Sequence, residues 1–131
     1  MSLADDPARA LIRELTRTAR GPKREGVFAL WLTVRVARDI AEGTSPSERG
    51  QRRRIQALEK RLSSLTLPPQ LRRALGATLA QLREVRPETA AAALAQLVAP
   101  TRDTLGAEAG EAVQAAARAA PQRVAASVGG R

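Results

Sequence analysis

The segment from Val27 to Ile40 constrains the fold more than any other, because its side chains are apolar almost all the way round a helix. Residues three and four apart share a face of a helix. By that spacing one side carries Val27, Leu30, Val34, Ala37 and Ala41, and the adjoining sides carry Ala29, Leu32, Val36 and Ile40. Such a helix needs cover on most of its surface, so we predict a central helix over residues 27–42, ending before Gly43.

The one remaining line of this helix begins aromatic and finishes charged. It carries Phe28, Trp31, Arg35, Arg38, Asp39 and Glu42, and its rings are the only Phe and the only Trp of the chain. Two interpretations follow. Either both rings belong to the core, or Phe28, Trp31 and Arg35 form a partner-binding site, since Trp and Arg are frequent among interface hot spots. In that arrangement Arg35 is placed to lie over the ring of Trp31 as a cation–π pair.

The rest of the chain is also typical of helices. A chain of 131 residues is one domain by length, and aromatic residues are only 2% of it, so Ala and Leu have to fill the core. No window has the alternation of a strand, and strong helix formers are abundant. We therefore predict an all-α, single-domain bundle of five to six helices over residues 1–120, with a flexible C-terminal tail at 121–131.

Proline and glycine mark the predicted ends of the first helix. Asp6 followed by Pro7 has the pattern of a helix start, and Gly21 with Pro22 ends the helix after Arg20. A short basic link, residues 21–26, then leads to the central helix.

An antiparallel helical hairpin is predicted over residues 46–85. Ser45, Pro46 and Glu48 have the pattern of a capping box at its start. The link at 66–69 is too short for any arrangement but two antiparallel neighbours. The apolar faces carry Ile55, Leu58, Leu62 and Leu65 in the first helix, and Leu71, Leu75, Thr78, Leu79, Leu82 and Val85 in the second.

Two further helices complete the expected bundle. One opens at Pro87 and is interrupted at Pro100, which leaves a short turn that ends at Gly106. The other is rich in alanine, covers residues 107–120 and ends at Pro121.

Positive charge is concentrated in the hairpin. The net charge is +9, and residues 48–86 hold ten basic and three acidic residues. We predict a basic patch made of Arg49, Arg52, Arg53, Arg54, Lys60, Arg72 and Arg73. A genome rich in G and C would also favour arginine, so the charge count alone does not assign a function.

The residue types that most enzymes depend on are missing. Without Cys, His or Tyr, the sequence excludes a thiol nucleophile, a Ser–His triad and a histidine acid–base pair. The pairs Asp39 with Glu42 and Glu108 with Glu111 lack the Glu-x-x-His of a di-metal bundle. No glycine-rich phosphate loop occurs. We expect neither catalysis, nor a cofactor, nor a metal site.

The sequence favours a non-catalytic helical protein–protein interaction module, an adaptor or assembly subunit whose Arg-rich face meets an acidic partner. The expected partner is another protein, a second copy of the chain included. The alternative is a nucleic-acid-binding protein that uses the basic patch for phosphate contacts. A membrane surface is disfavoured, and no small-molecule substrate is inferred. The longest apolar run, residues 27–34 with one threonine, is too short to cross a bilayer, so a cytoplasmic location is expected.

Overall fold

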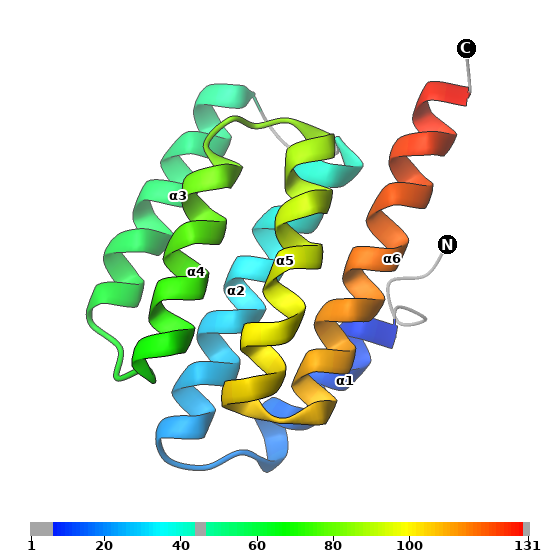
Figure 1. The fold of residues 1–131 in the computed structure, drawn as a ribbon. Coiled ribbons are helices and arrows are strands. Elements are labelled where there is room, and N and C mark those ends of the chain that lie inside the picture. Colours follow the sequence, from blue (N-terminus) through cyan, green and yellow to red (C-terminus); the bar gives the residue numbers. More distant parts are fainter. Residues whose placement is uncertain (1–6, 44–46, 130–131) are drawn as a thin grey trace.

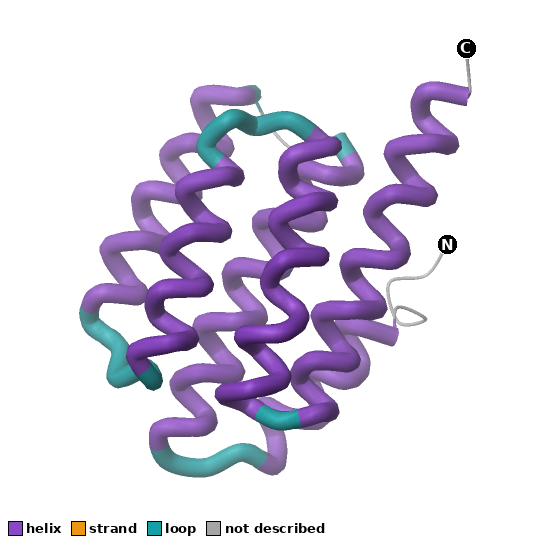
Figure 2. Tube along the Cα trace, in the orientation of Figure 1, coloured by secondary structure: helices purple, strands orange, loops and turns teal. Residues whose placement is uncertain are grey.

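Helices account for all the secondary structure in the described part of the chain (Figure 2). The computed structural model describes residues 7–43 and 47–129, and side chains at positions 10, 13–21, 23–43 and 47–119. The helices are α1 (Pro7–Thr18), α2 (Pro22–Glu42), α3 (Glu48–Ser63), α4 (Pro69–Leu82), α5 (Pro87–Leu105) and α6 (Ala107–Gly129). The predicted all-α bundle is confirmed.

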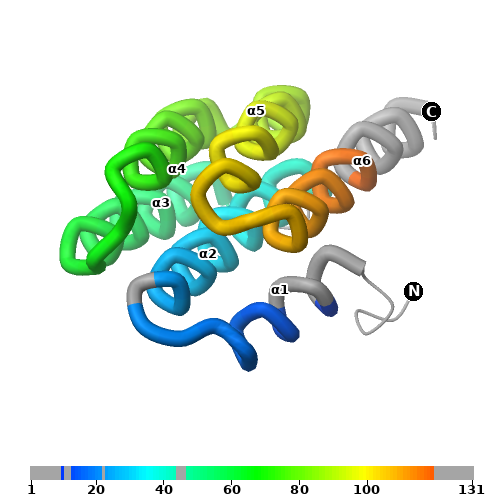
Figure 3. Tube along the Cα trace, turned by 60° about the horizontal axis from the view of Figure 1, so that its bottom comes forward, coloured from blue at the N-terminus to red at the C-terminus, as the bar shows by residue number. Residues whose placement is uncertain are grey.

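The helices form two packed layers of three (Figures 1 and 3). One layer places α2 between α1 and α3, and the other places α5 between α4 and α6. Helix α2 contacts each of the other five helices, which confirms its predicted central position. Its end is also as predicted, because Gly43 takes the left-handed conformation (φ 68°) that terminates a helix.

Leucine and alanine supply most of the core. Leu30 and Val34 of α2 are fully buried and belong to one core cluster with Leu94 and Leu97 of α5. Two glycines allow close approach: a Cβ on Gly26 would lie 2.8 Å from Leu105, and a Cβ on Gly110 would lie 2.9 Å from the Cβ of Arg102. Small residues therefore set how closely α5 and α6 approach their neighbours.

The hairpin of α3 and α4 is antiparallel, as predicted (Figure 1). Ile55, Leu58 and Leu62 are buried in its seam, and Leu65 is half-buried.

The boundaries of three helices differ from the prediction. Helix α2 begins at Pro22, so most of the predicted link at 21–26 is helical, and proline suits the first helical position. The link is instead residues 19–21, in which Gly21 has a positive φ of 64°. Helix α1 accordingly ends at Thr18. The N-cap of α3 is Ser47, whose Oγ accepts from the backbone N–H of Gly50 at 3.2 Å. The predicted cap residues Ser45 and Pro46 lie outside the described residues.

Neither of the two late prolines ends a helix. Helix α5 continues through Pro100 to Leu105, so the predicted interruption is wrong, although its predicted end at Gly106 is right. Thr101 and Leu105, which follow the proline, are buried, and this packing stabilises the last turn despite the missing N–H. Helix α6 likewise passes Pro121 and reaches Gly129. The helical structure does not test whether the segment 121–131 is flexible, so this flexibility stays a prediction.

A search of the described helices finds none that is both long enough and apolar enough to cross a membrane.

Candidate binding groove on α2

One side of α2 faces away from the second layer and is only partly covered. Helices α1 and α3 flank it, and their described residues make no contact with each other (Figure 3). Phe28, Trp31 and Leu32 on this side are half-buried, and Arg35 is exposed. The rings are therefore not core residues of the usual fully buried kind.

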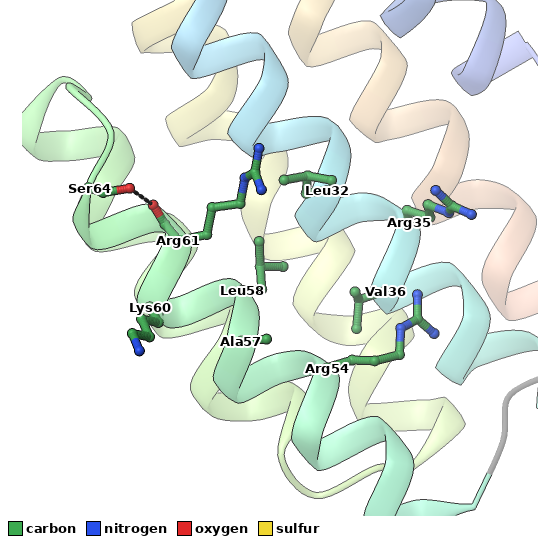
Figure 4. A pocket seen from close by; sticks show the side chains of 9 residues that line it. All are labelled: Leu32, Arg35, Val36, Arg54, Ala57, Leu58, Lys60, Arg61 and Ser64. Atoms are coloured by element: carbon green, nitrogen blue, oxygen red, sulfur yellow. Dashed lines mark hydrogen bonds between the residues drawn. The ribbon is translucent and has the colours of Figure 1, made fainter.

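A depression of about 590 Å³ lies between α2 and α3. Leu32 and Val36 of α2 face Ala57 and Leu58 of α3 across it (Figure 4). Its other lining residues are polar or charged: Arg35, Arg54, Lys60, Arg61 and Ser64. Figure 4 shows Arg54 and Arg61 extending from α3 toward α2, so the apolar floor has a guanidinium on each side.

A second depression, of about 520 Å³, lies between α1 and α2. Phe28 and Trp31 form its apolar part. Around them are Arg13, Thr16, Arg17, Arg24 and Arg35. Arg35 lines both depressions, so the two lie on either side of one ridge of α2. We call the pair of depressions and this ridge the α2 groove.

The described lining of the α2 groove carries seven cations and no carboxylate. Two of the cations have acidic partners beside the groove: Arg54 lies 3.0 Å from Asp39, and Arg17 lies 2.5 Å from Glu14. The hydrogen bond to Glu14, together with its charge, raises the pKa of Arg17 above its ordinary value, so this guanidinium stays charged. Among the other cations of the groove, four make no ion pair with any described residue: Arg13, Arg24, Arg35 and Lys60.

The cation–π pair of the groove differs from the predicted one. The guanidinium carbon of Arg61 lies 5.2 Å from the centroid of the Phe28 ring. Among the described residues, this pair forms the cation–π contact, and the predicted pair of Arg35 with Trp31 does not. Arg61 reaches Phe28 from the neighbouring helix, whereas Arg35 extends away from α3 (Figure 4). One face of Phe28 is thus covered by a cation.

Two residues of the predicted basic patch also make contacts within the fold. Arg72 donates to the carbonyl oxygens of Leu62, at 3.0 Å, and Leu65. Arg52 pairs with Glu48 and donates to the carbonyl oxygen of Arg83. These two arginines tie the ends of helices together.

The remaining patch residues are divided between two places. Arg54 and Lys60 line the α2 groove. Arg49, Arg53 and Arg73 are exposed and line neither depression.

Four lining residues of the α2 groove are not predicted from the sequence. Arg24 lies four residues before Phe28 and seven before Trp31, which places all three on one stripe of α2. The spacing places Arg24 on this stripe only if α2 begins at Pro22, whereas the sequence predicted a link at residues 21–26. Arg13, Arg17 and Arg61 come from other helices, and no spacing within α2 points to them.

Nothing in the described part of the chain brings together three or more Asp, Glu, His or Cys side chains that could hold a metal ion. No family model, curated protein or solved structure matches the chain.

Proposed function

We propose that this protein is a non-catalytic interaction module that binds an acidic segment of another protein in the α2 groove. The observation that carries the proposal is the combination of an apolar floor with seven cations and no described carboxylate in the lining. Apolar contact supplies affinity, and complementary charge supplies orientation and speed of association. Trp31 and Arg35 are also of the residue types that dominate binding energy at interfaces.

The groove is less suited to nucleic acid, the alternative partner. Binding of single strands depends on flat aromatic faces against which bases stack. Here one face of Phe28 is covered by Arg61, and the apolar part of the depression beside α3 is aliphatic. The arginines best placed for phosphate contacts, Arg49 and Arg53, lie outside the groove.

The groove is also less suited to a bilayer or to a second copy of itself. Apolar side chains that enter a membrane have to project beyond their surroundings, whereas Leu32 and Val36 lie in a depression. Two copies that meet groove to groove would bring like charges together.

Charge reversal in the groove tests the proposal. The protein is immobilised and used to capture proteins from a lysate of its own cells, before and after nuclease treatment. Arg24→Glu with Arg35→Glu alters the groove, and Arg49→Glu with Arg53→Glu makes the same change of charge on the outer face of α3.

We expect nuclease-resistant proteins, identified by mass spectrometry, that are captured by the wild type and the α3 variant and lost with the groove variant. Circular dichroism checks that both variants remain folded. Capture that nuclease abolishes, or that both variants lose equally, contradicts the proposal.

A further inference from the structure

The half-exposed stripe on the outer side of α2 is linear and is flanked by two walls. Arg24, Phe28, Trp31 and Arg35 follow one another at spacings of four, three and four residues. At 1.5 Å per residue the stripe is roughly 17 Å long, which matches about three turns of a second helix. Helices α1 and α3 form the walls, and their described residues do not touch each other. The groove thus has the form of a place beside α2 where one more helix would pack.

The floor offers side-chain pockets but few backbone partners. All three elements around it are helices, whose internal N–H and C=O groups are already bonded within the helix. An extended peptide would bring its own unpaired backbone groups to this surface without partners. A helical peptide satisfies its backbone internally and has only side chains to place.

Both walls carry the same sign of charge. Arg13 and Arg17 stand on the α1 side, and Arg54, Lys60 and Arg61 stand on the α3 side. Between the walls lie the apolar side chains of Phe28, Trp31 and Leu32. A helix that matches this surface has an apolar seam and acidic residues along both edges of the seam.

We infer that the partner segment is an acidic amphipathic helix that lies along the stripe from Arg24 to Arg35 and inserts apolar side chains into both depressions. Its apolar residues recur every three or four positions, and its Asp and Glu residues flank them. This inference rests on the proposed function and adds the conformation and register of the partner.

Trp31 is the only tryptophan of the chain and lines the groove, so its fluorescence reports on peptides that contain no tryptophan. Two peptides of identical composition, made of Glu, Leu and Ala, are compared. In one the leucines follow a helical spacing, and in the other they alternate, so that no helical face collects them. Peptides of about 15 residues are only marginally helical alone, so circular dichroism can detect helix that forms on binding.

A pair of variants separates apolar insertion from simple charge attraction. Ala57→Arg adds a cation and a long side chain at a position that lines the depression between α2 and α3. Gln56→Arg adds the same cation at the exposed neighbouring position, which does not line the groove. We expect Ala57→Arg to weaken binding of the helical peptide at least ten-fold, and Gln56→Arg to change it less than three-fold.

The outcomes distinguish the inference from the proposed function. A blue shift of Trp31, a gain of peptide helicity and at least ten-fold preference for the helical spacing support the inference. If both peptides bind equally and both variants bind them more tightly, the inference of a helical partner is wrong. The proposed function, binding of an acidic protein segment, then still stands. If neither peptide binds, while an oligonucleotide or vesicles of anionic phospholipid shift Trp31 in the same assay, both the inference and the proposed function fail.

Discussion

Arg72 and Arg73 are neighbours on α4, yet their guanidinium groups have different roles. Arg72 donates to the carbonyl oxygens of Leu62 and Leu65, which belong to the end of α3 and to the link after it. Arg73 is exposed and donates no such hydrogen bond to a described residue. An arginine of this chain therefore cannot be counted as part of a binding surface from its type alone.

Alanine substitutions should separate the two roles. We expect Arg72→Ala to lower the free energy of unfolding by about 0.5–1.5 kcal/mol, because the carbonyl oxygens at the end of α3 lose a donor. Arg73→Ala should stay within about 0.5 kcal/mol of the wild type. Urea unfolding of both variants makes the comparison, and equal losses would contradict the role given to Arg72.

Two glycines within helices differ in the space that their surroundings leave for a side chain. A Cβ on Gly110 would lie 2.9 Å from the Cβ and 3.2 Å from the Cα of Arg102, whereas a Cβ on Gly76 would meet nothing within 4 Å. The Cα of Arg102 cannot yield without moving α5, so Gly110→Ala should lower the free energy of unfolding by about 1–3 kcal/mol. Gly76→Ala should raise it by about 0.5–1 kcal/mol, since alanine loses less backbone entropy in a helix. Thermal unfolding measures both, and a stabilised Gly110→Ala variant would show that α5 and α6 pack less closely than described.

At the scale of the helix, the start of α3 depends on a single serine. The Oγ of Ser47 accepts from the N–H of Gly50, which makes Glu48 the first helical residue. We expect Ser47→Ala to lower the free energy of unfolding by about 1 kcal/mol, the usual cost of a lost N-cap. Ser45→Ala is the matched variant, because the sequence pattern places the cap there. A larger loss from Ser45→Ala than from Ser47→Ala would restore the predicted capping box.

The extent of the central helix could be predicted only in part from the sequence. The apolar residues from Val27 to Ile40 are enough to identify it and to give its end at Gly43. Its first turn has no apolar periodicity, and Gly26 resembles a link residue. The structure gives another reason for that glycine, since any Cβ there would press on Leu105. A contact with a distant helix cannot be seen in a local pattern.

The α2 groove could be predicted only in part from the sequence, because its walls belong to other helices. The half-exposed line of Phe28, Trp31 and Arg35 follows from spacing within α2. Its walls depend on how α1 and α3 are rotated about their own axes, which hydrophobic spacing specifies only loosely. Charge along the sequence likewise does not show that Arg52 and Arg72, which belong to the predicted basic patch, make contacts within the fold.

At the scale of the whole molecule, the net charge of +9 acts against compactness. The Debye length falls from about 30 Å at 0.01 M salt to about 8 Å at 0.15 M, so added salt screens this repulsion. We expect the Tm to rise between these two salt concentrations. Between pH 6 and pH 8 it should stay nearly constant, because the chain has no histidine or cysteine to titrate there. Differential scanning calorimetry tests both, and a Tm that falls with salt would contradict this view of the charge.

We propose that the outer side of α2 is open in the free protein and that a partner closes it. Acrylamide quenching of Trp31, the only tryptophan, measures this directly. We expect an emission that acrylamide quenches readily in the free protein and much less in the presence of the helical acidic peptide. A tryptophan that resists quenching in the free protein, as a fully buried core residue does, would contradict it.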